Sequence, residues 1–526
     1  MDFKNRQTPI KFCFNMKNKF LRFFKKYHSI LSFVVVLPLI LFSISGIILN
    51  HRELFSSIDL SRSWMPANYK FNNWNNAAVK GSVEIGKDSA LIFGNVGVYL
   101  ATENYSKFEN YNAGFAEGTD NHKIYDLIKT SDHSWYAGTL FGIFYFNPNK
   151  KAWEEIELPV HHKRITSLVE KDQVLHIFTR SELFKMPLGT TQLTEFKLPK
   201  PTDFENKVGL FKTLWIIHSG EIFGTVGKLV VDLTGIIFII ISFTGVFFFT
   251  FRKYFKTGKF AISREKRVVY KKTNMRWHNQ IGLYTAIILI ITTATGIFLR
   301  PPLLIPIANK YIGKIKYTIL DTPNPWFDRI RAVLYDDQLQ RWVFATSEGF
   351  YFSDNDFASD LQPYPYQPPV SVMGVNVLKN SGKGTYLVGS FSGIYRWFPD
   401  QYAAQDYLTG EMYQPAAGMT SPFGNAAVAG YLVNGFGQEF WFDYSGGAFP
   451  VATQLQFAEM PAEITSEKIS LWNVALEFHV GRMYEVFMGP FYILVVPISG
   501  LIVLFLIGSG VYLWFKMYWV RKKNKS

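Results

Sequence analysis

Four histidines have the residue type and the spacing to bind a metal-containing cofactor. His28 and His278 lie 250 residues apart, and each stands at the start of an apolar segment. His218 and His479 each precede another apolar segment, within the similar sequences WIIHSGEIF and LEFHVGRMY. Neutral imidazole is the usual nitrogen ligand of haem iron, and a helix bundle offers side chains for both axial positions. The spacing therefore suggests two facing pairs, His28 with His278 and His218 with His479, and one b-type haem for each pair.

A fifth histidine, His51, lies 23 residues after His28, about 35 Å further along a helix. Pro301 occupies the matching place in the second half of the chain, so His51 has no partner of its own kind and is only a further candidate ligand. Two other interpretations of the histidines stay open, namely hydrogen bonding to headgroups or backbone and a proton-linked transporter. The chain has no CxxCH motif, which excludes covalently attached c-type haem.

Four almost purely apolar segments must position these histidines. They are Ile30–Leu49, Leu229–Phe251, Ile281–Leu299 and Phe491–Phe515. Each is long enough to cross a hydrocarbon core of about 30 Å, which takes about 20 helical residues. The sequence therefore predicts an integral membrane protein with a bundle of four transmembrane helices, and not the buried core of a soluble protein.

Lysine and arginine are concentrated beside the ends of these segments. The first 27 residues hold eight Lys or Arg against one acid, residues 252–276 hold ten against one, and the residues after Phe515 hold five against none. By the positive-inside rule these parts are cytoplasmic, so both termini are predicted to face the cytoplasm. The net charge of +14 thus reflects topology and contact with the lipid bilayer, and it does not indicate nucleic-acid binding. The single cysteine, Cys13, cannot build a disulfide, a zinc site or an iron–sulfur cluster.

The chain contains two copies of one plan. The sequence SGIIL at 45–49 corresponds to TGIFL at 295–299, at the same offset of 250 residues as the first histidine pair. Each copy consists of a helix, a large outside segment and a second helix, which predicts a parallel repeat about an axis along the membrane normal. The second copy has about four extra residues near Gly489-Pro490. Small residues within the helices would allow close approach of helices or of a flat ligand, among them Gly46, Gly245, Gly296 and Gly510.

The predicted boundaries follow from these segments. We expect cytoplasmic basic parts at 1–27, 252–277 and 516–526, helices with their entries at 28–51, 213–251, 278–300 and 473–515, and β-rich periplasmic halves at 52–212 and 301–472.

The two outside segments are rich in aromatic residues, glycines and short alternating runs. Four stretches repeat a strand, a tight glycine turn and a second strand with an aromatic residue, at 91–99, 135–145, 342–351 and 386–395. Such repeats at intervals of about 40–50 residues suggest β-propeller blades, and about 330 residues would make about seven. The sequence thus predicts an all-β periplasmic domain in which both halves close one split β-propeller, with two separate β-rich domains as the alternative.

Five more histidines lie in the outside segments, and we expect them to be ordinary surface residues: His122, His133, His161, His162 and His176. Adjacent histidines on a strand point to opposite faces, which argues against a metal site at His161-His162. No repeated carboxylate pair and no Ser/His/Asp order points to hydrolysis, so no catalytic residue is predicted.

The pattern of histidine, SGIILNH, outside segment and His-x-Gly resembles the PepSY-associated transmembrane family. That family includes siderophore-iron reductases of the bacterial inner membrane. The resemblance implies a haem-binding bundle that delivers electrons from the cytoplasmic side or the quinone pool to a periplasmic acceptor. The family's paired histidines map onto His28, His218, His278 and His479, with His51 as a further candidate. The outside segments depart from this pattern, because they show no PepSY modules and instead resemble blades of periplasmic sensor domains in bacterial two-component proteins.

The leading hypothesis is a transmembrane oxidoreductase with two haem b groups. Electrons would pass from the His28–His278 pair to the His218–His479 pair and reduce a ferric chelate, such as a ferric siderophore, or a protein acceptor in the periplasm. No flavin- or nicotinamide-binding motif is present, so the donor is expected to be a quinol or a cytoplasmic partner. One alternative is a non-enzymatic receptor or scaffold that the bundle only anchors. A transporter is less favoured, because Asp232 is the main charge within the helices.

Overall fold

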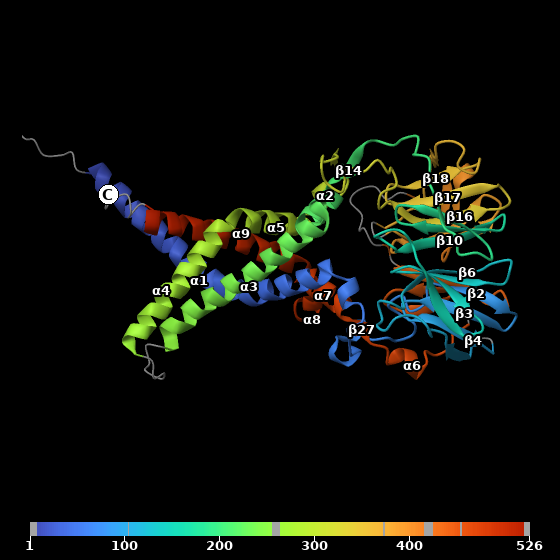
Figure 1. Ribbon diagram of the computed structural model, residues 1–526, viewed down its shortest axis with the longest axis horizontal. Helices are drawn as coiled ribbons and strands as arrows, with labels where there is room; N and C mark the ends of the chain where they lie inside the picture. Colours follow the sequence, from blue (N-terminus) through green and yellow to red (C-terminus); the bar gives the residue numbers. More distant parts are fainter. Residues whose placement is uncertain are drawn as a thin grey trace, which may run out of the picture. The chain divides into compact units, whose positions relative to one another are not determined.

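The computed structural model describes residues 8–103, 105–254, 263–371, 374–414, 424, 426–452 and 455–519. The chain forms two compact units, and both halves of the sequence contribute to each. The helical unit comprises Met1–Arg52, Asn206–Asp321 and Trp472–Ser526, and the β unit comprises Glu53–Glu205 and Thr322–Leu471 (Figure 1).

The helical unit contains seven longer α-helices within the described residues: α1 Thr8–Asn50, α2 Leu210–Ser219, α3 Gly224–Tyr254, α4 Arg264–Tyr284, α5 Ala286–Ile297, α7 Leu471–His479 and α9 Val495–Trp514. Short helical turns complete it: η4 Glu221–Phe223, η5 Ile305–Ile307, η7 Arg482–Tyr484, α8 Glu485–Met488, η8 Gly489–Leu494 and η9 Phe515–Trp519. Strands β14 (Lys207–Gly209) and β15 (Tyr311–Gly313) pair with each other. The extra residues near Gly489-Pro490 form η8, one additional stretch of helix before α9.

Three helical stretches of the described chain are long and apolar enough to cross a membrane: Lys19–Asn50, Glu221–Phe247 and Arg482–Met517. The consecutive helices α4 and α5 make a fourth if they are one span, although they are bent by 64° at their junction. The predicted basic tail is also helical from Thr8 onward, as part of α1. Part of the predicted basic loop, residues 255–262, lies outside the described residues.

The expectation of one continuous helix over Ile281–Leu299 is wrong at Thr285. There the backbone has φ −100° and ψ −1°, and the hydroxyl donates to the main-chain oxygen of Ile281 at 2.7 Å. A serine or threonine that bonds back to the preceding turn often bends a helix, and such a contact lies at the bend. An apolar run shows the length of such a span but not its curvature.

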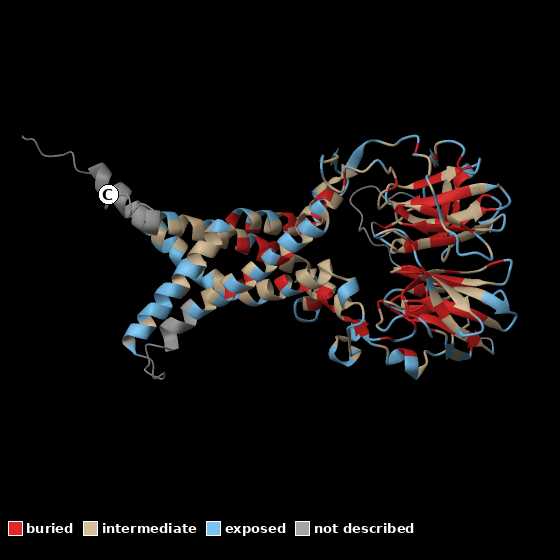
Figure 2. Ribbon diagram, in the orientation of Figure 1, coloured by how far each residue is buried: buried red, intermediate tan, exposed pale blue. Residues whose placement is uncertain are grey.

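Apolar side chains cover the outer surface of the bundle. On α3, Leu229, Leu233, Ile236 and Phe243 are 56%, 56%, 45% and 61% exposed. Figure 2 shows the same contrast, because buried residues are concentrated in the β-sheets while the helices are mostly intermediate or exposed. A helix that is apolar on its outside is suited to lipid, where every backbone polar group must be paired within the helix.

The β unit contains six antiparallel sheets of three or four strands in the described part of the chain, besides one two-stranded sheet. Their strands are β2 Gly81–Gly86, β3 Ser89–Gly94, β4 Gly97–Thr102 and β5 Lys107–Asn110; β6 Ile124–Lys129, β7 Trp135–Thr139, β8 Ile143–Asn147 and β9 Ala152–Ile156; β10 Ile165–Lys171, β11 Val174–Thr179, β12 Leu183–Pro187 and β13 Thr194–Phe196; β16 Ile330–Asp336, β17 Arg341–Thr346, β18 Phe350–Ser353 and β19 Gln362–Pro363; β20 Val375–Gly382, β21 Thr385–Ser390, β22 Gly393–Phe398 and β23 Ala403–Asp406; and β24 Val428–Val433, β25 Glu439–Asp443 and β26 Gly447–Pro450.

The first strands of the six sheets contact one another in cyclic order. β2 contacts β6, β6 contacts β10, β10 contacts β16, β16 contacts β20, β20 contacts β24, and β24 returns to β2. The four strand–turn–strand stretches predicted from the sequence are confirmed as the hairpins β3–β4, β7–β8, β17–β18 and β21–β22. The described residues thus hold six sheets of this kind, where the sequence suggested about seven.

Five of the six first strands carry a β-bulge at the same place, one residue after the strand begins. On β6 and β10 the residue after the bulge links to the next sheet. Asp126 accepts a hydrogen bond from the backbone of Leu168 at 2.8 Å, and Ser167 accepts one from the backbone of Val333 at 2.8 Å. Burial raises the pKa of Asp126 to about 6, against backbone hydrogen bonds and the charge of Lys379, which lower it.

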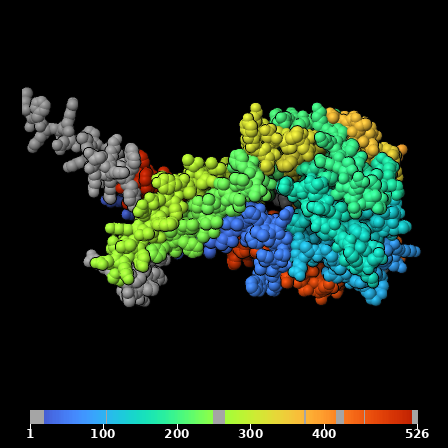
Figure 3. Space-filling view, viewed as in Figure 1, coloured from blue at the N-terminus to red at the C-terminus, as the bar shows by residue number. Residues whose placement is uncertain are grey.

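The N-terminal half closes against the last sheet of the C-terminal half. The main-chain oxygen of Asn73 accepts a hydrogen bond from Ala448 at 2.7 Å, and the indole of Trp74, fully buried, donates to the main-chain oxygen of Ala458 at 2.7 Å. Figure 3 shows segments of both halves side by side on one face of the β unit. The two outside segments therefore form one unit and not two.

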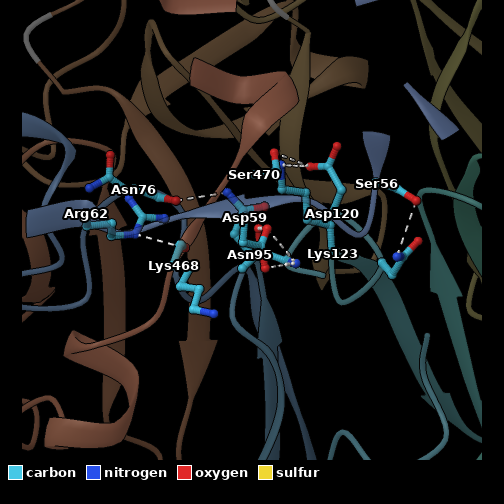
Figure 4. A network of polar contacts seen from close by, with 11 residues as sticks. Ser56, Asp59, Arg62, Asn76, Asn95, Asp120, Lys123, Lys468 and Ser470 are labelled. Carbon is cyan, nitrogen blue, oxygen red and sulfur yellow. Dashed lines mark hydrogen bonds and ion pairs between the residues drawn. The ribbon is translucent and has the colours of Figure 1, made fainter. Parts of the chain in front are cut away.

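A polar network lies where the chain enters and leaves the β unit (Figure 4). Strand β1 (Asp59–Leu60) pairs with β27 (Ile469–Ser470). The buried carboxylate of Asp120 accepts hydrogen bonds from Lys123 Nζ at 2.6 Å and from Ser470 Oγ at 3.0 Å. The network joins the first and last strands of the unit to the loop before β6. Short elements complete the unit: η1 Glu53–Phe55, η2 Arg62–Trp64, η3 Ala67–Tyr69, η6 Pro399–Gln401 and α6 Ala462–Thr465.

Candidate functional site

The helical unit brings the four repeat-matched histidines together in two pairs. The imidazole centroids of His28 on α1 and His278 on α4 are 6.4 Å apart. Those of His218 on α2 and His479 on α7 are 5.9 Å apart. These are the two pairings expected from the sequence, and each joins one histidine from each copy of the repeat.

In the first pair, hydrogen bonds fix which ring nitrogen carries the proton. His28 Nδ1 lies 2.8 Å from Ser509 Oγ, and His278 Nδ1 lies 2.9 Å from Thr244 Oγ1. Each hydroxyl donates its own hydrogen to a main-chain oxygen three residues earlier, at 3.0 Å and 2.9 Å. A hydroxyl that donates to the main chain is left to accept from the imidazole, which favours the tautomer with the proton on Nδ1 and the lone pair on Nε2.

The second pair follows the same rule. His479 Nδ1 lies 3.0 Å from the main-chain oxygen of Phe42 and 3.0 Å from Ser45 Oγ, and His218 Nδ1 lies 2.9 Å from the main-chain oxygen of Thr292. A carbonyl oxygen can only accept, so Nδ1 carries the proton in both rings. No hydrogen bond to Nε2 of any of the four histidines occurs among the described residues. An imidazole that donates through one nitrogen to an oxygen is oriented for metal binding through the other.

A glycine on a neighbouring helix makes room for each imidazole. A Cβ atom added to the glycine would lie 2.7 to 3.6 Å from Cε1 of the histidine, for the four contacts Gly296–His218, Gly46–His479, Gly510–His28 and Gly245–His278. In each case a serine or threonine precedes the glycine in the sequence. The Ser/Thr-Gly dipeptide thus supplies the space for all four imidazoles, and for His28, His278 and His479 it also supplies a hydroxyl beside Nδ1.

The geometry of the pairs fits a metal that brings other ligands with it. Two imidazoles on one ion, with nitrogens about 2.0–2.1 Å from the metal and about 1.2 Å from the ring centres, would hold those centres about 6.5 Å apart. Within the described part of the chain, no group of three or more His, Cys, Asp or Glu side chains could hold a bare metal ion. Haem iron needs only two axial protein ligands, because the macrocycle provides the other four nitrogens, so the two-histidine donor sets fit haem.

An arginine pair that the sequence analysis missed lies just after the ends of α5 and α7. Arg482, three residues after His479, donates through Nε to Glu477 at 2.9 Å. Arg300, four residues after Gly296, has a buried Nε with no hydrogen-bond partner in the described structure, and the charge of Arg482 acts on it. A carboxylate is the natural partner for such a guanidinium. Arginines flanking an apolar segment usually indicate only a membrane boundary, which explains why the sequence did not single them out.

His51 does not join either pair. Its Nε2 lies 2.6 Å from Oδ2 of Asp232 on α3. Asn50 donates to Oδ1 of the same carboxylate at 2.9 Å and to the main-chain oxygen of Ser219 at 3.2 Å. The carboxylate of Asp232 therefore occupies one of the two ring nitrogens of His51 and links α1 to α3.

An apolar layer separates the two pairs. Its centre is one buried side chain from each of α1, α3, α5 and α9, namely Val35, Phe238, Leu289 and Val503. Along α1, His28 and the Ser45–Gly46 contact of the second pair are 17 residues apart, which is about 26 Å of helix. The pairs therefore lie at two depths of the bundle.

Among the loop histidines, the expectation of a surface position is wrong for His176. His176 lies on β11, is 3% exposed and packs against Trp342 with centroids 4.9 Å apart. Burial and, second, the charge of Lys185 lower the pKa of this histidine to about 4. Both faces of a middle strand between stacked sheets are covered, so a polar residue there is buried whichever way it points. His133, His161 and His162 are exposed, and His122 is half-buried.

Solved structures with a related arrangement are only distantly similar. Two crystal structures of the extracellular domain of BT4673 from B. thetaiotaomicron, described as a one-component and as a hybrid two-component system, share 12% and 13% identity with TM-scores of 0.33 and 0.34. They cover 71% and 77% of this chain, and it covers 32% and 37% of theirs. The N-terminal domain of Nup159 has 8% identity and a TM-score of 0.29, with 74% of this chain and 95% of that one covered. At these scores the likenesses assign neither fold nor function.

Sequence comparison is more informative for the helices. No curated protein sequence matches the chain. The family described as PepSY-associated TM region matches residues 3–252 and again residues 209–517, so the two matches together cover nearly all of it. The chain is therefore a membrane protein that belongs to the PepSY-associated TM region family.

Proposed function

We propose that this protein is a transmembrane haem oxidoreductase with two b-type haem sites, one formed by His28 and His278 and the other by His218 and His479. The observation that carries the proposal is the fourfold recurrence of one arrangement. Each imidazole donates from Nδ1 to an oxygen, rests on a glycine and faces a second imidazole about 6 Å away. A structural histidine needs a hydrogen bond, but it has no need for a matched glycine and a matched partner.

Bound haem iron supplies one-electron chemistry, and the protein supplies ligation, orientation and burial. Ser509, Thr244 and the main-chain oxygens of Phe42 and Thr292 hold the imidazoles in the tautomer with Nε2 unprotonated. At the outer pair, Arg300 is placed to neutralise a carboxylate of the bound group.

The charge distribution supports one orientation of the bundle in the membrane. The basic residues near His28 and His278 support an orientation in which that pair faces the cytoplasm of a bacterial inner membrane and both termini are inside. Two haem sites at two depths suit a protein that passes electrons from a quinol or a cytoplasmic donor to a periplasmic acceptor. A ferric chelate such as a ferric siderophore is the acceptor class that the family resemblance favours.

The β unit is proposed to be a split six-bladed β-propeller. The first strands of the six sheets contact one another in a closed cycle, and this supports the proposal. In a propeller the blades surround a central axis, and the first strand of each blade lies next to that axis. The N-terminal segment around Trp74 would complete the last blade.

The test is a reduced-minus-oxidised optical spectrum of the detergent-purified full chain, with haem quantified per chain. We expect two low-spin b-type haems, and the single variants His28→Ala, His218→Ala, His278→Ala and His479→Ala should each lose one of them. His51→Ala and His162→Ala are matched controls and should keep both. If all four ligand variants kept full haem content, the assignment would fail. A protein without haem, even after expression with added haem precursor, would instead point to the anchored receptor.

A further inference from the structure

One exposed side of α4 combines basic and aromatic residues. Most of α4 is exposed (Figure 2). Val269 and Arg276 are seven residues apart in the sequence, and so are Tyr270 and Trp277. A separation of seven residues is about two helical turns, which places both pairs on one side of the helix. We call this surface the α4 face, and it is formed by Lys266, Val269, Tyr270, Thr273, Arg276 and Trp277.

The apolar and aromatic side chains of the α4 face are largely exposed. The exposed fractions are 59% for Val269, 52% for Tyr270 and 59% for Trp277. Another side of α4 packs against α3, where Asn274 donates to the main-chain oxygen of Thr244 at 2.9 Å. The α4 face is therefore not the side that holds α4 in the bundle, and its aromatic rings are open to a further partner.

The basic residues of α4 argue against a helix that lies in the surface of a bilayer. Residues 264–277 hold six Lys or Arg against one acid. At about 100° per residue, Lys266, Arg267 and Lys272 point in three different directions around the helix axis. A helix in a bilayer surface needs one wide apolar face, whereas basic residues occur on every side of this part of α4. Exposed Trp and Tyr beside Arg are instead typical of the centre of a protein docking surface.

We propose that the α4 face is the docking surface for a small acidic electron-carrier protein of the cytoplasm, which donates electrons to the His28–His278 pair. The assignment of this donor rests on the proposed function and orientation, and it selects a protein over a quinol. Trp277 adjoins His278 in the chain, so a carrier bound to the α4 face lies beside that pair. A quinol is uncharged and arrives through lipid, so it gains nothing from exposed cations. The carrier is oxidised by one electron, the ferric iron of the proposed site is reduced, and no bond forms or breaks.

The test is microscale thermophoresis of the full chain in detergent, with flavodoxin and a two-iron ferredoxin as acidic probes. Electron-transfer complexes bury little surface and are steered by charge, so we expect weak binding of at least one probe that falls steeply with added salt. The double variant Lys266→Glu with Arg276→Glu should weaken this binding by about tenfold. Trp277→Ala should weaken it without changing its salt dependence. The matched control is Lys19→Glu, which reverses an exposed charge on α1 nine residues before His28 and should bind like the wild type.

Reduction of the bound haem gives a second readout. In anaerobic stopped-flow mixing, the reduced carrier should reduce the double variant about tenfold more slowly than the wild type, while dithionite reduces both at the same rate. Lys266→Gln with Arg276→Gln replaces the double variant if gel filtration shows that it misfolds. Binding is also measured on His278→Ala, where it should persist, and haem content is measured in every sample. Failure of docking is thus distinguishable from failure of the oxidoreductase proposal.

Three outcomes overturn the proposal. The first is that neither probe binds, or that the double variant and Lys19→Glu bind equally well. The second is that duroquinol reduces the haem faster than either carrier does, which favours a quinol as the donor. The third is that the double variant loses anionic lipid in native mass spectrometry while its carrier binding is unchanged, which favours a contact with lipid headgroups.

Discussion

Replacing the four glycines that contact the histidines one at a time should reduce haem content in a graded order. A Cβ atom at Gly296 would lie 2.7 Å from Cε1, 3.0 Å from Nδ1 and 3.5 Å from Nε2 of His218. The closest Cβ contact would be 3.2 Å at Gly46, 3.5 Å at Gly510 and 3.6 Å at Gly245. Only the 2.7 Å contact at Gly296 is far below van der Waals contact. The four alanine variants therefore make the same chemical change but differ in how strongly the new methyl group collides with the histidine.

The structure sets the size of the effect at Gly296. The His218 ring would have to move by about 0.7 Å to reach ordinary contact, whereas a metal–ligand distance tolerates about 0.2 Å. Helix α5 has little room to retreat, because a Cβ at Gly500 of α9 would already lie 2.1 Å from Ile297, the residue after Gly296. Disturbing the group that orients a ligand typically costs 10–100-fold in metal affinity. If the two pairs bind haem as proposed, Gly296→Ala should lose the haem of the His218–His479 pair and keep that of the His28–His278 pair.

The assay is haem per chain by pyridine haemochrome after gel filtration, together with the low-spin optical spectrum. We expect about one haem for Gly296→Ala, a partial loss for Gly46→Ala, and the wild-type content for Gly245→Ala and Gly510→Ala, given two sites in the wild type. Equal haem content in all four variants, or a larger loss in Gly245→Ala than in Gly296→Ala, would refute the assignment of these glycines.

Three further predictions concern the β unit and are read by guanidinium unfolding of the full chain in detergent. Because burial raises the folded-state pKa of Asp126 to about 6, the free energy of unfolding of the wild type should fall as the pH rises from about 4 to 6. Asp126→Asn lacks this ionisation, so its free energy of unfolding should rise by about 3 kcal/mol relative to that of the wild type between pH 4 and pH 7. The same pH dependence of unfolding in both proteins would contradict this. Trp74→Ala should cost about 3–5 kcal/mol and raise hydrogen exchange at the Ala448 amide, since it opens a cavity between the first segment and the last sheet. Asp120→Asn should cost about 3–5 kcal/mol by removing the carboxylate from buried Lys123, whereas the double variant Asp120→Leu with Lys123→Met should recover most of this loss; equal losses would argue against the ion pair.

Apolar length and repeat offset were enough to predict the helices and the histidine pairs. A run such as Leu229–Phe251 is apolar all round because lipid surrounds it, and this signal does not depend on distant contacts. The offset of 250 residues predicted that His28 faces His278, because a parallel repeat brings equivalent positions together across its axis. The bend at Thr285 was not predictable in this way, since the length of an apolar run says nothing about the curvature of the helix.

The β unit shows the same limit. Hairpins with a glycine turn were found from the sequence, but β11–β12 was missed because Glu182 stands where the others have glycine. In that hairpin the backbone of Thr179 donates to Glu182 at 2.9 Å and its hydroxyl accepts from the backbone of Ser181 at 3.1 Å. Thr139 and Thr346 hold their turns in the same way. These three hairpins share the threonine hydroxyl that closes the turn, and they do not share the glycine. A search for threonine at the last residue of the first strand would have found the β11–β12 hairpin.

The difference between the two copies also supports a structural role for His51. Pro301 stands where the second copy would have this histidine, and Pro497 lies 13 residues before Gly510, as Asp232 lies 13 residues before Gly245. Both partners of the His51–Asp232 contact are thus proline in the other copy. A metal ligand could be replaced independently of its neighbours. In a hydrogen-bonded pair that joins two helices, replacing either residue removes the contact between the helices. The joint replacement favours a contact that holds α1 against α3, so His51→Ala and Asp232→Ala should cost similar stability, show a strong coupling in a double-mutant cycle, and leave haem content unchanged.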